Sequence, residues 1–239
     1  MSYADVDDAR LYDVQNAWGP SDDFYLALVR EATDVLDVGC GTGTLLKRAR
    51  RNGHQGRLVG IDPGIGMLTV AREEPEIEWV EGVLLPGAYD EEFDLVTMTG
   101  HAFQELRTDE ELHAVLRGMR DATRPGGRVA FETRNPGARE WESWQGASFE
   151  VPYQGETLTV SYEVHQVDGD LVTFTETTAG GSRDSRRDTG TLRFLSRLDL
   201  DRFLAGAGLQ VATYYGDWSK GPLTDTSPEI IAVARRSAR

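Results

Sequence analysis

Residues 35–43 read VLDVGCGTG, in which an apolar run typical of a buried strand passes directly into glycines at 39, 41 and 43. The residues that follow, Thr44 to Arg50, favour a helix. A strand, a glycine turn and a helix N-terminus together are typical of a nucleoside-binding corner, because glycine lets backbone approach a ligand more closely than a residue with a Cβ. We therefore expect a nucleoside site at this turn.

The spacing of the glycines separates two kinds of nucleoside site. A dinucleotide fingerprint is Gly-x-Gly-x-x-Gly, and its third glycine lets the helix pack close under a pyrophosphate. Here position 44 is Thr, and the turn is preceded by the acidic Asp37. A carboxylate repels phosphate and suits a cationic or zwitterionic ligand. An NAD-linked oxidoreductase is therefore the least favoured function of those considered.

The composition is that of a globular chain without a membrane or secretory segment. Its 239 residues, 39% hydrophobic, suffice for one domain or for one domain with a cap. No apolar run reaches the ~18 residues of a membrane span, and the acidic start of the chain lacks an apolar signal region. We expect a cytoplasmic protein without a membrane partner. The single cysteine, Cys40, excludes an internal disulfide and is expected to be a small residue filling the turn rather than a nucleophile.

The net charge of −15 disfavours nucleic acid as a partner. The densest basic clusters, residues 183–187 and Arg235-Arg236, are short and are expected to be a solvated loop and a solvated tail. We expect a small-molecule partner, whereas nothing in the sequence indicates the oligomeric state.

Strands and helices are predicted to alternate through the first part of the chain. Apolar runs predict strands at 33–38, 57–62, 77–81, 93–98 and 128–132, and amphipathic patterns predict helices at 22–31, 44–52, 63–74 and 109–123. Arg124-Pro125-Gly126-Gly127 is expected to end the last of these helices. This order implies a parallel sheet with right-handed crossovers, whose ligands lie outside the carboxyl ends of the strands.

The pattern changes after residue 146. Strands are predicted at 147–152, 157–167, 171–178 and 189–195 with no helices between them, and Asp168-Gly169-Asp170 predicts a tight hairpin turn. We expect residues 147–195 to form a small antiparallel β insertion that packs over the strand ends as a cap or lid. Residues 1–146 and 196–239 are expected to form the main domain, completed by a helix at 199–207 and strands at 209–215 and 229–234.

Four segments together carry a resemblance to a known family. They are residues 35–43, Gly60-Ile61-Asp62-Pro63, residues 93–98 and residues 124–127. Their order and spacing resemble the class I S-adenosylmethionine-dependent methyltransferases over about residues 33–134, and more loosely over the two final strands. The resemblance implies an α/β fold, with a Rossmann-like, mostly parallel seven-stranded sheet that ends in an antiparallel hairpin. It also implies S-adenosyl-L-methionine as the cofactor and S-adenosyl-L-homocysteine as its product.

Asp62 ends the second predicted strand, where an acid can accept both ribose hydroxyls of a nucleoside; the alternative role is a helix N-cap. The resemblance implies that the glycine turn lines the methionine part of the cofactor, with Asp37 facing its ammonium group directly or through water. Where the family often has Gly-Asp after the third strand, this chain has Gly82-Val83-Leu84, so adenine recognition must rely on backbone and apolar stacking. The expected cofactor contacts are Asp37, Gly39, Cys40, Gly41, Gly43, Asp62, Pro63, Met67, Gly82, Val83, Leu84, Met98, Thr99 and His101.

Methyl transfer requires a base only if the nucleophile must lose a proton. His101, just after the fourth predicted strand, is the candidate base, and the alternative role is a hydrogen bond to the cofactor carboxylate or to loop backbone. His54, His113 and His165 are expected to be surface or structural residues. No Cys/His spacing indicates zinc and no acidic cluster has a calcium-loop pattern, so no metal is expected.

The acceptor pocket is expected at the same sheet edge, where several aromatic residues gather. The candidate substrate contacts are Tyr12, Trp18, Phe103, Arg134, Asn135, Trp141, Trp144, Tyr215 and Trp218. The aromatics have an alternative role as core of the cap, and Arg134 has an alternative partner in Glu132. The leading hypothesis is N- or O-methylation of a small molecule. The alternatives are a protein or RNA acceptor and a non-catalytic binder of the cofactor or its product.

Overall fold

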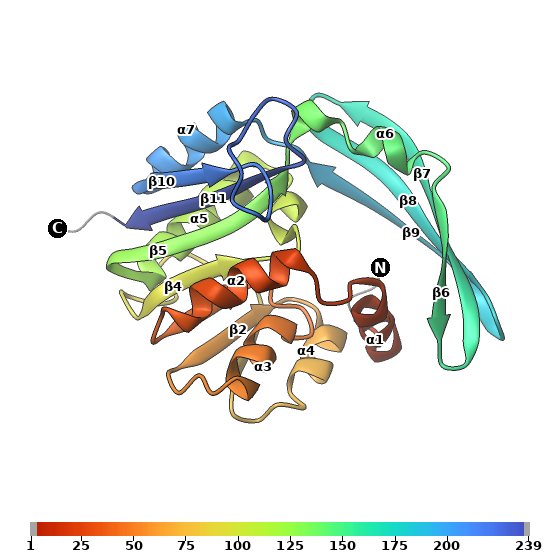
Figure 1. The fold of residues 1–239 in the computed structure, drawn as a ribbon, viewed down its shortest axis with the longest axis horizontal. Helices are drawn as coiled ribbons and strands as arrows, with labels where there is room; N and C mark the ends of the chain where they lie inside the picture. The colour runs from red at the N-terminus through yellow and green to blue at the C-terminus, as the bar shows by residue number, and fades with distance from the viewer. Residues whose placement is uncertain (1–3, 237–239) are drawn as a thin grey trace.

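The computed structural model describes residues 4–236 and contains two β-sheets (Figure 1). The helices are α1 (Val6–Gln15), α2 (Pro20–Arg30), α3 (Thr44–Arg51), α4 (Ile65–Ala71), α5 (Asp109–Ala122), α6 (Trp141–Trp144) and α7 (Arg197–Ala207), with short 3-10 turns η1 (Ala102–Glu105) and η2 (Pro136–Ala138). The strands are β1 (Val35–Val38), β2 (Leu58–Asp62), β3 (Glu78–Glu81), β4 (Phe93–Met98), β5 (Thr123–Arg134), β6 (Ser148–Tyr153), β7 (Glu156–Asp168), β8 (Leu171–Gly180), β9 (Arg183–Arg193), β10 (Leu209–Tyr215) and β11 (Glu229–Arg236).

The main sheet has seven strands in the order β10-β11-β5-β4-β1-β2-β3. The pairs β1·β2, β1·β4, β2·β3 and β4·β5 are parallel, whereas β11 runs antiparallel to both β5 and β10. The predicted mostly parallel sheet with a final antiparallel hairpin is confirmed. Two antiparallel steps make β10 point the same way as β5, so the carboxyl ends of β5 and β10 share one edge.

Helices cover both faces of this sheet. On one face α2 and α3 bury Phe24, Val29 and Leu46, and on the other α5 and α7 bury Leu116 and Leu204. Helix α5 begins with a capping box, in which Thr108 and Glu111 each accept from the other residue's backbone N–H. Because both faces are covered, all of β1 and β2 is buried, and these strands read as nearly continuous apolar runs.

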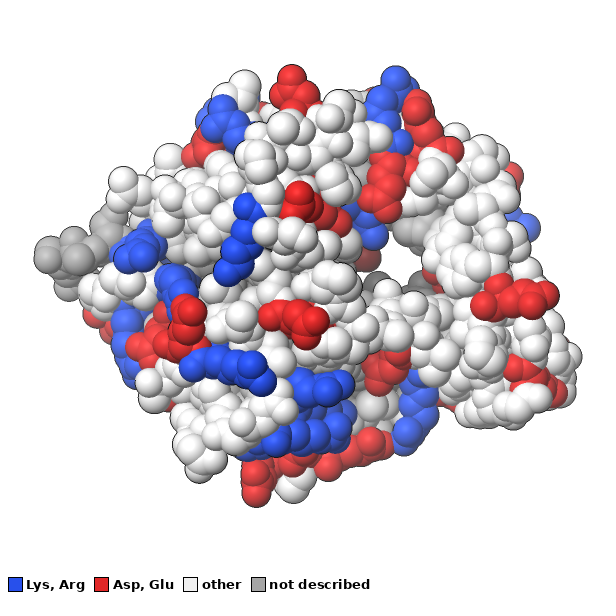
Figure 2. All heavy atoms as spheres, in the orientation of Figure 1, with Lys and Arg blue, Asp and Glu red and all other residues white. Residues whose placement is uncertain are grey.

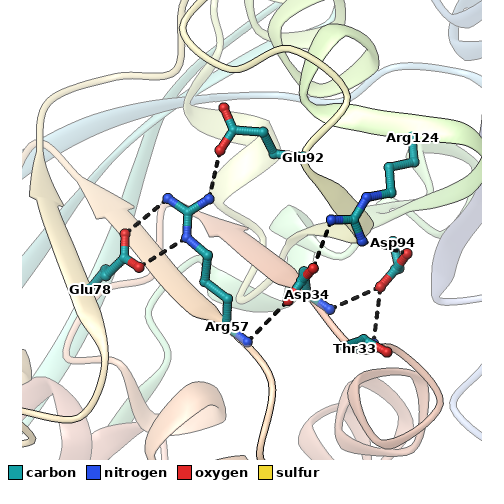
Figure 3. Close-up of polar contacts among 7 residues, drawn as sticks. All are labelled: Thr33, Asp34, Arg57, Glu78, Glu92, Asp94 and Arg124. Carbon is teal, nitrogen blue, oxygen red and sulfur yellow. Dashed lines mark hydrogen bonds and ion pairs between the residues drawn. The ribbon is translucent and has the colours of Figure 1, made fainter.

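An ion-pair network ties the amino ends of the strands together (Figure 3). Arg57, just before β2, binds Glu78 and Glu92 with distances of 2.6–3.0 Å, and its hydrogen bonds lower the pKa of Glu78. Arg124 binds Asp34 at 2.7 Å and Asp94 at 2.9 Å. The network lies at the edge opposite the carboxyl ends, so it stabilises the fold and leaves the predicted ligand edge free.

The second sheet is antiparallel in the order β6-β7-β8-β9, and we call it the cap sheet. The tight turn between β7 and β8 is confirmed, with Gly169 at φ 59°. The fourth strand begins at Arg183 rather than at 189, so the basic cluster 183–187 is part of a strand and the prediction of a loop is wrong. Within this strand Arg186 pairs with Asp188 at 2.9 Å and with Asp8 of α1. The division into a main domain and an insertion stays a prediction.

The chain end differs from the prediction as well. Arg236 closes β11 and is 5% exposed, and its Nη1 donates to the backbone carbonyls of Arg120, Asp121 and Thr123. The prediction of a solvated tail is therefore wrong for Arg236, whose hydrogen bonds fix the C-terminal end of α5. Strand β5 is also longer than predicted, because residues 124–127 form a register shift inside it instead of a separate turn.

Several helical starts differ from the prediction, by two residues each at α2, α4 and α7. Helix α2 begins at Pro20 with Gly19 as its N-cap, earlier than expected, because Pro suits the first helical position. Helix α1 was not predicted at all. Its Leu11 packs among cap-sheet residues such as Leu158, and its Ala9 packs on Met67 of α4. Helix α1 thus lies between the cap sheet and α4 (Figure 1), and no helix among residues 4–236 is long and apolar enough to cross a membrane.

Candidate functional site

The glycine turn between β1 and α3 depends on left-handed backbone. Gly39, Gly41 and Gly43 have φ of 68°, 56° and 77°, a region that residues with a Cβ rarely adopt. A Cβ on Gly39 would stand 2.9 Å from the Cβ of Ala102, whereas a Cβ on Gly41 would meet no atom within 4 Å. The backbone at Gly41 therefore faces open space, where a ligand can approach it.

Asp37 is buried directly before this turn, with 1% of its surface exposed. Its Oδ1 accepts a hydrogen bond of 2.8 Å from Thr97, and its Oδ2 bonds no residue among those described. Burial raises the pKa of Asp37 to about 7. A nearby cation would favour the charged form of such a carboxyl, so the position suits a positively charged ligand group.

Asp62 accepts hydrogen bonds from the backbone on both sides of the site. Its Oδ2 accepts from Gly41 N at 2.8 Å and its Oδ1 accepts from Gly64 N, beside the start of α4, at 2.7 Å. Burial raises its pKa as well. The N-cap of α4 is Gly64, so the alternative role of Asp62 as the helix N-cap is wrong. The lone pairs that remain on a carboxylate leave the ribose role as a prediction.

Helix α1 lies across the glycine turn. The Thr42 hydroxyl donates to Asp13 at 2.5 Å, and a Cβ on Gly100 would stand 3.5 Å from the Tyr12 hydroxyl oxygen. Burial, followed by the charges of Asp13, Glu132 and Asp62, raises the pKa of Tyr12 to about 12. Tyr12, an expected substrate contact, therefore lies at the carboxyl edge.

His101 is held by two carboxylates from neighbouring strands. Its backbone has φ 59°, and its N–H donates to Glu132 of β5 at 2.7 Å. Its ring Nε2 lies 3.0 and 3.1 Å from the carboxylate oxygens of Glu229, the first residue of β11. The hydroxyl of Tyr25 in α2 donates to the other oxygen of Glu132. The loop after β4 is thus fixed at its backbone and at its ring.

The carboxyl edge has an excess of acid. Among residues 4–236, no Lys or Arg pairs with Asp37, Asp62, Glu132 or Glu229, although each is at most 8% exposed. Burial raises the pKa of Glu132 too. We call these four residues the carboxylate cluster. Its field favours a cationic ligand over an anionic one.

Several expected cofactor contacts have buried side chains. Cys40 packs with Leu68 and Trp79, and burial raises its thiol pKa far above the ordinary value, which fits the small-residue role and an inert thiol. Met67, Leu84 and Met98 lie in the hydrophobic clusters. Of the remaining expected contacts, Pro63 and Val83 are exposed, Gly82 has no side chain, and Thr99 is partly buried.

Two expected acceptor contacts are structural in the first place. Phe103 is 2% exposed and stacks on Phe131 with ring centroids 4.2 Å apart, so its ring belongs to the core and not to the mouth of the site. Asn135 donates from Nδ2 to the backbone carbonyls of Thr224, Asp225 and Ser227, and so fixes the loop before β11.

The other acceptor candidates fall into two groups. Arg134 bonds Gln104 at 2.8 Å and Glu140 at 3.2 Å rather than Glu132, and Trp141 and Trp144 pack as core of the cap sheet. Around α2, Trp18 lies under Arg48, and Tyr215 and Trp218 pack edge-on against Phe24. The second group adjoins the site through Trp218, which also contacts Tyr25 with centroids 6.1 Å apart. In the first group, Arg134 adjoins the site through its backbone, which pairs in register with Glu229.

Four polar residues of the site were not among the expected contacts: Tyr25, Thr97, Glu132 and Glu229. Two carried a signal in the sequence. Glu132 lies in the apolar run near the last residue of β5, and Glu229 is the first residue of the apolar run of β11. Each is therefore a carboxylate next to a terminus of a buried strand. Within residues 4–236 no group of three or more His, Cys, Asp or Glu is arranged to hold a metal ion.

Comparison with known proteins identifies the family. Residues 35–127 match a family model described as a methyltransferase domain. The chain is 28% identical over 214 residues to a cypemycin N-terminal methyltransferase from Streptomyces sp, covering 84% of this chain and 82% of the relative. It is 31% identical over 160 residues to a 2-phytyl-1,4-naphtoquinone methyltransferase from Thermosynechococcus vestitus, covering 63% and 69%.

A similar solved structure extends the fold match to almost the whole chain. It is the SAM-bound structure of an amino pentose methyltransferase from Micromonospora echinaspora, with a TM-score of 0.71, 21% identity and 93% of each chain covered. The fold and the glycine corner thus define a methyltransferase. The chain belongs to the class I S-adenosylmethionine-dependent methyltransferases, and its cofactor is S-adenosylmethionine.

Proposed function

We propose that this enzyme methylates the nitrogen of a small-molecule amine. The observation that carries the proposal is the carboxylate cluster, which has no Lys or Arg partner among residues 4–236 and adjoins the ring of His101. An amine in its ammonium form gains from these charges, whereas a carboxylate acceptor is repelled by them. Arg134 does not offset this preference, because Gln104 and Glu140 already bind it.

The residues present fit the cofactor. The open backbone at Gly41, the buried Asp37 and the strand-end Asp62 are the groups that would hold its methionine and ribose parts. When bound, the cofactor supplies a methyl group on a cationic sulfur. Its positive charge would complement Asp37 of the carboxylate cluster, and its adenine end would meet backbone at Val83, which is 58% exposed.

The names of two similar proteins support an amine acceptor. One is a cypemycin N-terminal methyltransferase and the other is an amino pentose methyltransferase. The quinone methyltransferase among the relatives supports a small organic acceptor of another kind. The carboxylate cluster favours the amine.

Cofactor binding is tested by calorimetric titration. The wild type should bind S-adenosylmethionine, and Asp62→Ala should weaken binding about tenfold or more, which is about 1.4 kcal/mol. Asp184→Ala, at an exposed position of β9, is the control and should bind like the wild type. Absence of binding to the wild type would refute the cofactor assignment.

The acceptor is tested by release of S-adenosylhomocysteine with a panel of compounds. The panel pairs amines with oxygen acceptors of similar size: an amino sugar and its parent sugar, an aromatic amine and its phenol, and a short peptide with a free or acetylated N-terminus. We expect turnover only with the amine of a pair. Turnover of the phenol alone would contradict the proposal, and cofactor binding without turnover of any amine would favour a non-catalytic binder.

A further inference from the structure

The contact between His101 and Glu229 joins residues 128 positions apart in the chain. His101 follows β4 at its carboxyl end. Glu229 opens β11, which runs antiparallel to β5, and pairs in register with Arg134 at the end of that strand. The reversed last hairpin is what brings the start of β11 to the edge where the parallel strands end. A glutamate at the start of a parallel strand would lie at the opposite edge.

The two ring nitrogens of His101 have different surroundings. Nε2 faces both oxygens of Glu229, and a carboxylate can only accept hydrogen bonds, so Nε2 carries the hydrogen. Nδ1 bonds no described residue. Unlike Nδ1 of His54 and of His113, which are buried without a partner, Nδ1 of His101 is not fully buried. The His101 side chain is 23% exposed. In this tautomer Nδ1 has a free lone pair and open access.

The backbone of His101 is also held in an uncommon conformation. A φ of 59° is left-handed and costs a residue with a Cβ about 1 kcal/mol. The bond from its N–H to Glu132, whose other oxygen binds Tyr25, fixes this conformation from β5 and α2. Strain that is held by buried partners next to a ligand edge indicates a functional position.

We infer that Glu229 is the positioning residue that makes His101 the general base of methyl transfer. The inference deepens the amine methylation proposed above. The ammonium form of the acceptor has no lone pair for attack, so Nδ1 of His101 removes one of its protons. The freed nitrogen pair forms the bond to the methyl carbon, and the carbon–sulfur bonding pair remains on sulfur. Glu229 stabilises the imidazolium that forms.

The ionisable groups that face His101 come from each element packed around it. They are Glu229 of β11, Glu132 of β5, Tyr25 of α2 behind Glu132, and Tyr12 of α1 beside Gly100. Glu229 is the one among them that contacts the ring. A change in tautomer after substitution of Glu229 therefore reports this contact.

The first test reads the tautomer without any acceptor. Nitrogen NMR of histidine-labelled protein, with His101→Gln to assign the signal, should show hydrogen on Nε2 of His101. Glu229→Gln keeps an acceptor and should keep this tautomer, whereas Glu229→Leu should give a mixture. A wild-type ring with hydrogen on Nδ1, or an unchanged spectrum in Glu229→Leu, overturns the inference. This result does not depend on which acceptor the enzyme uses.

The second test separates positioning from cofactor binding. With an amine accepted by the wild type, Glu229→Leu should lower kcat by about tenfold or more and flatten the rise of kcat/KM with pH, and Glu229→Gln should restore part of kcat. The affinity for S-adenosylmethionine should stay within a factor of about two. Glu163→Gln, on the exposed part of β7, is the control. A parallel loss of cofactor affinity and kcat, or an unchanged pH profile, would show a structural role instead. A wild type that methylates no amine would refute the proposed function while leaving the tautomer result intact.

Discussion

The indole of Trp79 fills the space that a Cβ on Gly43 would occupy. The same ring lies 2.5 Å from the Cβ position of Gly60, whose Cβ would also stand 2.8 Å from Cys40 Sγ. One glycine of the turn and one glycine of β2 thus make room for one aromatic ring of β3. The glycine turn is therefore set partly by packing beneath it and partly by the open space above Gly41.

Alanine substitutions should separate these two roles. Gly43→Ala should destabilise the fold by about 2 kcal/mol or more, because it adds a collision with Trp79 to the left-handed strain. Gly41→Ala should cost about 1 kcal/mol, since no atom is near its Cβ, yet weaken S-adenosylmethionine binding about tenfold. Urea unfolding and calorimetry measure both effects. Gly155→Ala, at φ 83° in an open turn of the cap sheet, should show the strain without a change in binding.

Asp37→Asn should stabilise the folded protein at neutral pH and weaken binding of the cofactor. The folded-state pKa of Asp37, about 7, lies above the unfolded value, so the unfolded chain loses its proton first as pH rises. The stability contribution of the protonated form is full below about pH 4 and is lost towards pH 7. Asparagine does not titrate. Urea unfolding gives the change in the free energy of unfolding that Asp37→Asn causes. This change should be more favourable at pH 8 than at pH 4 by about 1–3 kcal/mol.

The same variant should bind S-adenosylmethionine at least about tenfold more weakly at pH 8, because the negative charge is gone. Asp184→Asn, on the exposed surface of the cap sheet, is the matched control for both measurements. An identical pH dependence of unfolding in the wild type and Asp37→Asn would contradict the buried, protonated state.

The bond between Asp13 and Thr42 should hold α1 on the glycine turn. Asp13→Asn and Thr42→Val should each speed amide exchange in α1, and a double-mutant cycle should give a coupling energy of about 1 kcal/mol. Dissociation of S-adenosylmethionine, followed by stopped flow, should accelerate in both variants. Unchanged exchange of the α1 amides in the single variants would mean that the cap sheet alone holds the helix.

Asn135→Ala should loosen the segment before β11. Its amide bonds three backbone carbonyls of residues 224–227, and their loss should cost about 2 kcal/mol in the free energy of unfolding. Because this segment leads to Glu229, turnover of an amine should fall while cofactor affinity is retained. Asn52→Ala, at the exposed end of α3, should change neither quantity. Loss of cofactor affinity in Asn135→Ala would place the segment in the cofactor half of the site instead.

The main sheet was predictable because its strands are buried on both faces. β4 was predicted at its observed bounds, Phe93–Met98, and the start of β2 differs by a single residue from the prediction, since continuous apolar runs admit few other structures. The strand-end rule then located Asp62 and His101 at one edge, and the family resemblance placed Asp37 there. These predictions needed only local pattern and the known handedness of crossovers.

What escaped prediction depends on partners distant in sequence. Helix α1 has few apolar residues, and its burial comes from contacts such as Tyr153 with Asp7, which lie 146 positions apart. From the sequence alone, Trp144 could be a site residue or a core residue. Its contact with Phe174 of β8 is what places it against the cap sheet. The pairing of Glu229 with His101 requires the register of the last hairpin, which no local pattern contains.

Helix α1 contacts both the glycine turn and the cap sheet, and this has a kinetic consequence. Through Asp13 it holds the glycine turn, and through Leu11 and Asp8 it holds the cap sheet. Because Asp13 binds Thr42 of the glycine turn, we expect a docked α1 to hinder entry and exit of the cofactor, whereas Glu229 at the start of β11 bonds His101 and no described residue of this helix. We therefore expect a compulsory order, with S-adenosylmethionine bound first and S-adenosylhomocysteine released last. Product inhibition by S-adenosylhomocysteine should then be competitive against the cofactor and non-competitive against the amine.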